Sequence, residues 1–174
     1  MRKIITLILV FLFSSCSVKQ PLTDTQRYTQ MRSTLSKIPM VYPLKDAVDD
    51  KHFVNAAVPP YTNNASTLKS FTNKIAKGIS AELIVVTYTD EGDPILTIVQ
   101  YNGTAYLAIR DTTRDKNGVK VIEEFKYKTW QMFTMDNRNH YYLFNRSVTY
   151  DEYMKSLLSS HSEDQIDHLS VCFE

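Results

Sequence analysis

Residues 81–145 alternate between strand-forming segments and short turns, and this pattern limits the fold more than any other feature of the chain. Residues 81–88 (AELIVVTY) are rich in β-branched side chains and apolar on both faces, which is typical of a central strand. Turn-forming residues separate this segment from four more expected strands, which cover 95–101, 104–110, 119–133 and 140–145. Asn102-Gly103 is the strongest short hairpin signal, since both residues tolerate the positive φ of a type I′ turn. The pattern predicts an antiparallel meander of about five strands.

Amphipathic segments on either side of this region predict helices that cover the sheet. Capping-box spacing predicts helices over 24–37 and 150–159, and an apolar stripe between Asn64 and Gly78 predicts another. A short helical turn is expected over 44–49, after a proline. The chain has 174 residues, of which 43% are hydrophobic, so it can bury a substantial core. We therefore expect a single α+β domain over 23–174, with its helices packed on one face of the sheet.

The first sixteen residues (MRKIITLILVFLFSSC) have the pattern of an export signal. Two basic residues precede an apolar run that, as a helix, covers roughly half of a bilayer core and is too short to span it. Residues 13–16 resemble the bacterial lipobox, in which a peptidase cleaves before a cysteine that becomes lipidated. We expect a signal peptide over 1–15, a lipidated Cys16 with a tether to residue 22, and a domain on the extracytoplasmic face of the cell membrane. The alternative is an ordinary secretory signal with a chance cysteine.

Charge and cysteine content exclude other classes of protein. The formal charge of +1 excludes the broad basic surface of a nucleic-acid binder. Lipidation of Cys16 would leave Cys172 as the only thiol, so the fold cannot depend on an internal disulfide. Cys172 is expected to be a small buried hydrophobe, and pairing with another molecule is the alternative. The four glycines form no phosphate-binding loop, and no cofactor is expected.

Several segments resemble a known family. YTDEGDPI (88–95), QYNG (100–103) and DTTRDKNG (111–118) are similar to segments of a bacterial lipoprotein family known only as domain of unknown function 4362. LKDAVDDKHFVN (44–55) is similar to the opening of that family. The resemblance implies a family-like core over about 42–145 and an exported lipoprotein of Gram-positive bacteria. It implies no activity, because none is established for the family.

Charged side chains concentrate in two turns that a meander places at the same end of the sheet. The residues concerned are Asp90, Glu91, Asp93, Asp111, Arg114, Asp115 and Asn117. Arg114 is expected to pair with Asp93 or Asp111 if the two turns meet. The leading hypothesis is a non-catalytic module that binds an unknown protein or small ligand at this end. The alternative is a pair of plain structural turns.

Two further functions are open. Thr113, Asp115, Asn117 and Glu124 occupy positions 1, 3, 5 and 12 of a calcium-binding loop, which would make the protein a calcium-stabilised module, although the match is partial. An extracytoplasmic hydrolase that uses Asp or Glu is the other alternative. It requires a concave pocket that contains a carboxyl group with a raised pKa.

The remaining polar and aromatic clusters have simpler explanations. His161, Asp164 and His168 would share one face of a terminal helix, which a frayed polar helix explains better than a metal site. Aromatic side chains between 125 and 144 either fill the core or form a ligand-stacking platform.

Overall fold

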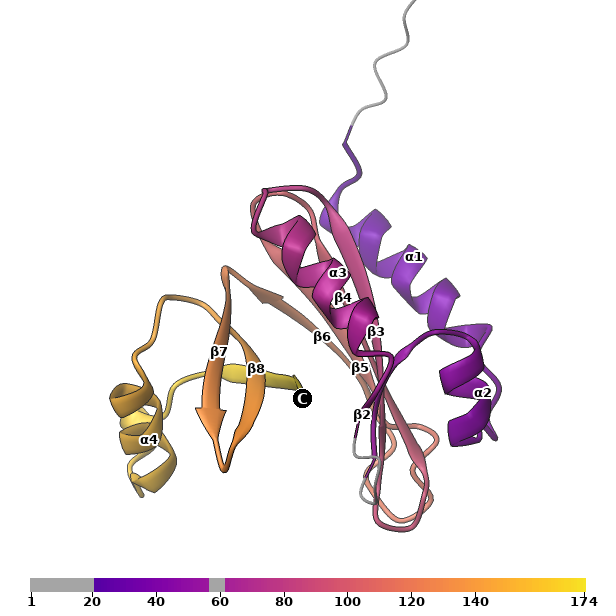
Figure 1. Ribbon diagram of the computed structural model, residues 1–174. Coiled ribbons are helices and arrows are strands. Elements are labelled where there is room, and N and C mark those ends of the chain that lie inside the picture. Colours follow the sequence, from indigo (N-terminus) through magenta and orange to yellow (C-terminus); the bar gives the residue numbers. More distant parts are fainter. Residues whose placement is uncertain (1–20, 57–61) are drawn as a thin grey trace, which may run out of the picture.

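The computed structural model describes residues 21–56 and 62–174, which form two β-sheets and four α-helices (Figure 1). The expected signal peptide and Cys16 lie outside the described residues. The helices are α1 (Asp24–Ser36), α2 (Leu44–Asp49), α3 (Ala65–Ile75) and α4 (Tyr150–Leu158), with a 3₁₀ turn η1 (Ser162–Asp164). The strands are β1 (Phe53–Asn55), β2 (Thr62–Asn63), β3 (Ala81–Tyr88), β4 (Pro94–Tyr101), β5 (Tyr106–Asp111), β6 (Ile122–Tyr127), β7 (Thr129–Met135), β8 (Arg138–Phe144) and β9 (His168–Phe173). The predicted α+β class is confirmed. None of the described helices has the length and hydropathy of a membrane-spanning segment.

The larger sheet has six strands in the order β2-β1-β3-β4-β5-β6. Its β3 to β6 strands form the predicted antiparallel meander. The sequence did not predict β1, which pairs in parallel with β3 and reaches it through α3. A three-residue strand is too short to give a clear alternating pattern. The sheet is therefore mostly antiparallel, with one parallel pair.

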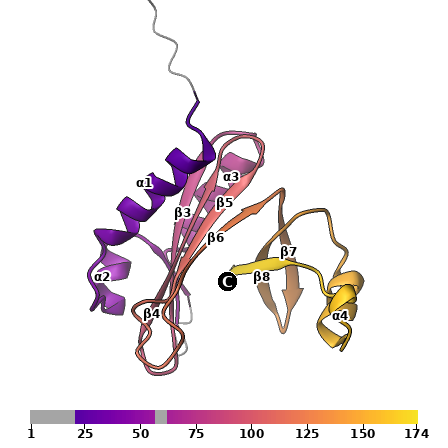
Figure 2. The ribbon, with the colours of Figure 1, turned by 180° about the vertical axis from the view of Figure 1, so that it is seen from behind.

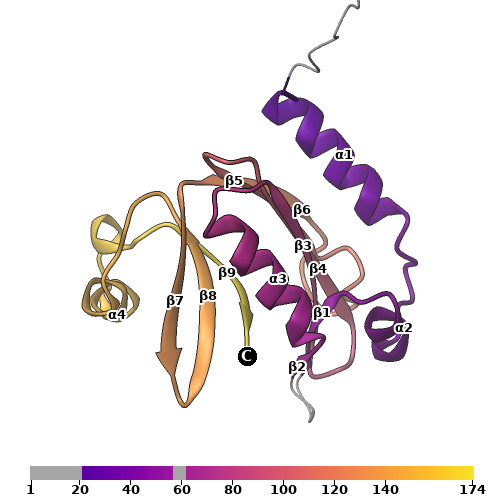
Figure 3. The same cartoon turned by 45° about the horizontal axis from the view of Figure 1, so that its top comes forward.

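Helices cover both faces of the larger sheet, which corrects the prediction that they pack on one face (Figures 2 and 3). On one face, Phe71 of α3 packs with Val85 in a buried cluster. On the other face, Met31 of α1 packs with Val86 in a second cluster. The reason lies in β3, β4 and β5, which carry apolar side chains at successive positions and so present an apolar surface on each side.

The predicted strand over 119–133 is divided between the two sheets. Tyr127 is opposite Tyr106, the first residue of β5, so beyond that point β6 has no further partner in the larger sheet. The chain turns at Lys128 and enters β7, which pairs with β8 in a three-stranded sheet of order β7-β8-β9 (Figure 1). The single five-stranded meander was therefore wrong beyond β6, and β9 was not predicted.

The type I′ hairpin occurs at a different turn from the one predicted. Asp136 and Asn137 both have positive φ, of 51° and 60°, and join β7 directly to β8. At the predicted position only Gly103 has a positive φ, and the loop is four residues long. The Asn102 side chain explains this, because its Oδ1 atom accepts hydrogen bonds from the backbone N–H groups of Thr104 and Ala105.

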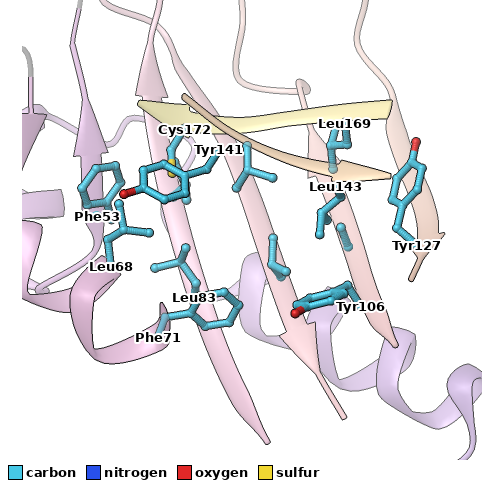
Figure 4. Close-up of a cluster of buried hydrophobic side chains, with 14 residues drawn as sticks. Phe53, Leu68, Phe71, Leu83, Tyr106, Tyr127, Tyr141, Leu143, Leu169 and Cys172 are labelled. Atoms are coloured by element: carbon cyan, nitrogen blue, oxygen red, sulfur yellow. The ribbon is translucent and has the colours of Figure 1, made fainter. Parts of the chain in front are cut away.

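The smaller sheet packs against the face of the larger sheet that also carries α3 (Figure 4). Leu143 of β8 and Leu169 of β9 join Leu83 in this core. Cys172 is buried there, and burial raises the pKa of its thiol. A separate cluster between the smaller sheet and α4 is mainly aromatic, and its buried members are Phe133, Tyr142, Phe144, Val148 and Tyr153. The aromatic residues thus fill the core and do not form an open platform.

Candidate functional site

The two charged turns meet at one end of the larger sheet, as the meander predicted. The backbone N–H of Lys116 donates to Asp93 Oδ2 at 2.9 Å, and Lys116 Nζ lies 3.0 Å from Asp93 Oδ1. The hydrogen bonds from Lys116 lower the pKa of Asp93. Asp93 therefore holds the two turns together, and its charge is already balanced.

Arg114 pairs with Asp111 and not with Asp93. Its Nη1 atom lies 2.5 Å from Asp111 Oδ2, and both side chains are almost fully buried. Three other guanidinium N–H groups donate to the backbone carbonyls of Leu35, Ile38 and Pro39, at and after the end of α1. Desolvation acts to raise the pKa of Asp111, but hydrogen bonds from Thr113 and Arg114 outweigh it and lower this pKa. Arg114 is therefore a buried structural clamp on α1, with four of its five guanidinium N–H groups bonded within the fold.

The remaining predicted surface residues differ in role. Asp90 and Glu91 are exposed and make no ion pair with any other described residue. Asp115 Oδ1 accepts from the backbone N–H groups of Asn117 and Gly118, which shapes the turn. Of the seven residues, Asp93, Asp111, Arg114 and Asp115 are therefore committed to the geometry of the turns, and the exposed side chains of Asp90, Glu91 and Asn117 are available to a partner.

The residues of the predicted calcium loop already have other partners. Thr113 bonds to Asp111 through both its backbone N–H and its hydroxyl. Glu124, the expected twelfth ligand, lies on β6 and forms an ion pair with Arg32 of α1. Across residues 21–56 and 62–174, no three His, Cys, Asp or Glu side chains are grouped so that they could hold a metal ion.

No described group supports the hydrolase alternative. The pKa values of Asp93, Asp111 and Glu152 are all shifted downward, the opposite of what a general acid at neutral pH requires.

A polar network at α2 joins the Tyr42 hydroxyl to Asp50 at 2.7 Å and to His52 Nδ1 at 3.0 Å. Burial lowers the pKa of His52 and raises that of Tyr42, so both are neutral at pH 7.

A cavity of about 170 Å³ lies between the larger sheet and β9, and sequence reasoning missed it. Its floor is made by Thr87, Ile95, Thr97 and Arg110, which share the sheet face under the smaller sheet. Their register places them together, because Thr97 is opposite Arg110 and Thr87 is opposite Ile95. The remaining lining residues are Asn55, Ser170, Val171, Cys172 and Phe173. Thr87 and Ile95 also flank the first charged turn, so this Arg110 pocket lies at the predicted end of the sheet.

The Arg110 pocket has an unbalanced positive charge. No ion pair or hydrogen bond joins the Arg110 side chain to another described residue, although Glu123 is opposite it on β6. The lining includes three hydroxyl groups and no carboxylate. A sequence signal existed, because Thr87, Thr97 and Arg110 are polar residues at positions of the strands that otherwise face the core. Polar residues at core-facing positions near one end of a sheet indicate a polar site.

The roof of the pocket is fixed by a buried asparagine. Asn55 Nδ2 donates to the carbonyl of Phe173 at 2.7 Å, and the backbone N–H of Phe173 donates back to Asn55 Oδ1 at 3.2 Å. These two bonds attach the end of β9 to β1, beside the polar floor. The pocket is therefore built from elements that are held rigidly with respect to each other.

A larger cavity of about 750 Å³ lies beside α4 and η1, outside the two sheets. Its charged lining mixes both signs, and Arg146 and Glu152 form an ion pair within it. His161, Asp164 and His168 do not share a helical face here, because His168 is the first residue of β9. The terminal segment pairs with β8 as a strand, and this tertiary pairing outweighs the helical spacing of its polar residues.

The comparisons with known proteins give a family and no activity. No curated protein matches the chain, and no solved structure matches it. The family described as Domain of unknown function (DUF4362) matches residues 53–143, which run from β1 into β8 and include the floor of the Arg110 pocket. Because that match covers more than half of the sequence, the chain belongs to the DUF4362 family.

Proposed function

We propose that the protein is a non-catalytic binding module, anchored by a lipid on Cys16 to the extracytoplasmic face of the cell membrane. It binds a small ligand, or the end of a larger one, through a carboxylate or phosphate group in the Arg110 pocket. This places the ligand beside the two charged turns and not on their side chains.

The N-terminal sequence supports the location. A basic pair, a short apolar run and Ser-Ser-Cys at 14–16 have the order required for export and lipidation. Lipoprotein processing adds more than one acyl chain to the cysteine, and two or more chains are needed for stable anchoring. The described domain begins a few residues after Cys16, so it would remain close to the membrane.

One observation carries the binding role, namely the arginine without an anionic partner at the floor of a hydroxyl-lined pocket. A guanidinium group recognises carboxylate and phosphate through paired N–H donors, and Thr97 and Ser170 offer further donors. The cavity of about 170 Å³ has room for roughly five water molecules, which suits one such group and excludes a large ligand. The pKa values of Asp93, Asp111 and Glu152 are lowered and not raised, and the described part of the chain groups no metal ligands, so neither observation supports a reaction.

Metabolic labelling tests the anchor. Cells that express the full chain are grown with labelled palmitate, beside cells that express Cys16→Ala. We expect label in the wild type only, and a wild-type protein that stays with the membrane fraction after a high-salt wash. Unlabelled wild-type protein, or unprocessed protein in the cytosol, would overturn the location.

Thermal unfolding tests the pocket. The melting temperature of the purified protein is measured with increasing inorganic phosphate or acetate, at constant ionic strength. At ten times the Kd, binding stabilises the folded state by about 1.4 kcal/mol and raises the melting temperature by about 3–6 °C. Arg110→Met should abolish the shift, and Lys37→Gln, which removes an exposed charge from the end of α1, should keep it. A shift that survives in Arg110→Met, or no shift with either anion, refutes the pocket.

A further inference from the structure

The end of the domain nearest the tether carries exposed lysines without carboxylate partners. Lys69, Lys74 and Lys77 line a shallow groove of about 370 Å³ along α3 and the residues after it. The other lining residues are two serines, Asn73 and Ile79, so the groove contains no acidic side chain. None of the three lysines forms an ion pair with another residue of the described ranges. The sequence alone suggests only a solvated helix face here.

The strand register places this groove at the same end of the molecule as the start of the described chain. Lys126 near the end of β6 forms an ion pair with Asp24 at the first turn of α1. Gly103, in the loop between β4 and β5, lies beside the carbonyl of Gly78, which follows α3. Figure 1 shows the beginning of α1 and the end of α3 both at the top, on opposite faces of the larger sheet, with the β3–β4 and β5–β6 turns at the opposite end.

The length of the tether limits which end of the domain can meet the membrane. Six residues lie between Cys16 and Thr23, the N-cap of α1, so the extended tether, with its seven Cα–Cα steps, reaches about 25 Å at most. The eight residues of β3 add about 26 Å between this end and the opposite turns. Only the end with Lys74 and Lys77 lies within easy reach of the lipid surface.

The charge distribution favours the same orientation. The three groove lysines are positive, and Ile79 beside them is half exposed, as a side chain that enters a headgroup layer would be. At the opposite end the charges are mixed, because the exposed acids Asp90 and Glu91 lie in turns that also carry exposed Lys116 and Lys120. An anionic surface is therefore attracted more strongly to the groove lysines near the tether than to the end with the Arg110 pocket.

We propose that the lysine groove of α3 docks on the anionic phospholipid headgroups of the membrane to which the protein is anchored, so that the Arg110 pocket points away from the bilayer. The inference rests on the proposed function, because it takes the lipid on Cys16 as given. Each lysine near an anionic surface strengthens attachment about fivefold, so three lysines raise the ratio of docked to undocked domains by roughly 100-fold. The attraction between the lysines and the headgroups decays over about one Debye length. Added salt shortens this length, so docking should weaken as the salt concentration rises.

The test uses the lipidated full chain in vesicles, with an environment-sensitive fluorophore on Asn73→Cys in the groove. The native Cys172 is buried and does not compete for the label. The vesicles are phosphatidylcholine alone, or phosphatidylcholine with phosphatidylglycerol, each with a quencher attached to the headgroups. We expect quenching with phosphatidylglycerol only, reversed by salt. A label on Asn117→Cys, in the second charged turn, should remain unquenched in both.

Matched variants distinguish the effect of the groove lysines from the effect of positive charge elsewhere on the surface. Lys69→Gln/Lys74→Gln/Lys77→Gln should lose the quenching, and three other exposed lysines replaced together, Lys37, Lys120 and Lys155, should leave it unchanged. Equal quenching on neutral vesicles, or quenching that survives in the groove variant, overturns the docking. Failure of the anchor gives a different result, because the protein then leaves the vesicles in high salt. In that case low-salt sedimentation with anionic vesicles still tests the groove, and equal sedimentation of the groove variant refutes it.

Discussion

Replacing Arg114 by methionine removes the side chain that ties the β5–β6 turn to the end of α1. Its guanidinium group donates to the carbonyls of Leu35 at 3.1 Å, Ile38 at 2.8 Å and Pro39 at 3.0 Å. It also forms the buried ion pair with Asp111. Methionine keeps an apolar chain of similar length, so the change removes the charge and the donors with little loss of packing.

The size of the effect follows from burial. The side chains of Arg114 and Asp111 are 3% and 6% exposed, so water cannot replace the lost partner. Removing one member of a buried pair costs about 3–5 kcal/mol, because the other charge remains buried without compensation. For a chain of this size each kcal/mol lowers the melting temperature by about 2–4 °C, so we expect a drop of roughly 6–20 °C.

Urea and thermal unfolding, followed by circular dichroism, measure this loss. Arg32→Met is the matched control, since Arg32 also joins α1 to the larger sheet, through an exposed ion pair with Glu124. Such surface pairs contribute about 0–1 kcal/mol. Equal losses in the two variants would refute the structural role of Arg114. Combining Arg114→Met with Asp111→Asn should cost less than the sum of the single changes, because both remove the same pair.

The pH dependence gives a second check on the same pair. The pKa of Asp111 is lowered in the folded protein, so its contribution to stability is complete above the unfolded pKa of about 4 and is lost as pH falls through the lower folded value. Since Arg114 is one cause of the lowered pKa, the acid loss of stability should be shallower in Arg114→Met. An identical acid profile in wild type and variant would contradict the assigned cause.

Three other measurements test the rest of the structure. Asn55→Ala removes both bonds to the end of β9, and should cost about 1–3 kcal/mol in urea unfolding; an unchanged midpoint would contradict the anchoring role. The Cys172 thiol should react with a thiol reagent only as fast as the protein unfolds, and rapid reaction in native buffer would contradict its burial. Burial raises the pKa of Tyr28 and Tyr88 to about 12, above the unfolded value of about 10. The folded state then holds more protons between these values, so unfolding free energy should fall as pH rises from about 10 to 12, and tyrosinate absorbance that develops fully near pH 10 would refute it.

Local signals were sufficient for the elements that depend on local interactions. Thr23 and Thr149 form the predicted capping boxes, and α2 has the predicted bounds. The strands β3, β4 and β5 follow from β-branched residues between turn formers. These features depend on contacts between residues that are close in sequence, so the local sequence is enough to predict them.

The predictions that failed concern features that depend on residues far away in the sequence. The division at Lys128 is decided by where β5 begins, and β9 exists because β8 offers a free edge. Likewise, Arg110 and Arg114 are close in sequence and carry the same charge, yet one faces a pocket and the other lies buried among the carbonyls at the end of α1. Arg110 lies in β5 and Arg114 lies in the turn that follows it, so strand alternation does not relate the two, and only the tertiary packing around each side chain determines its role.

The family region is completed by elements that lie outside it. Residues 53–143 contain the larger sheet, but α1 and β9, which cover its two faces, lie before and after this range. Two buried polar side chains within the region hold these covers, since Arg114 binds the end of α1 and Asn55 binds the end of β9. Because neither contact is apolar, each fixes one geometry where hydrophobic packing alone would tolerate several. Residues of β9 line the Arg110 pocket, so the buried amide of Asn55, which holds the end of β9, sets the shape of that pocket as well as contributing to the stability of the fold.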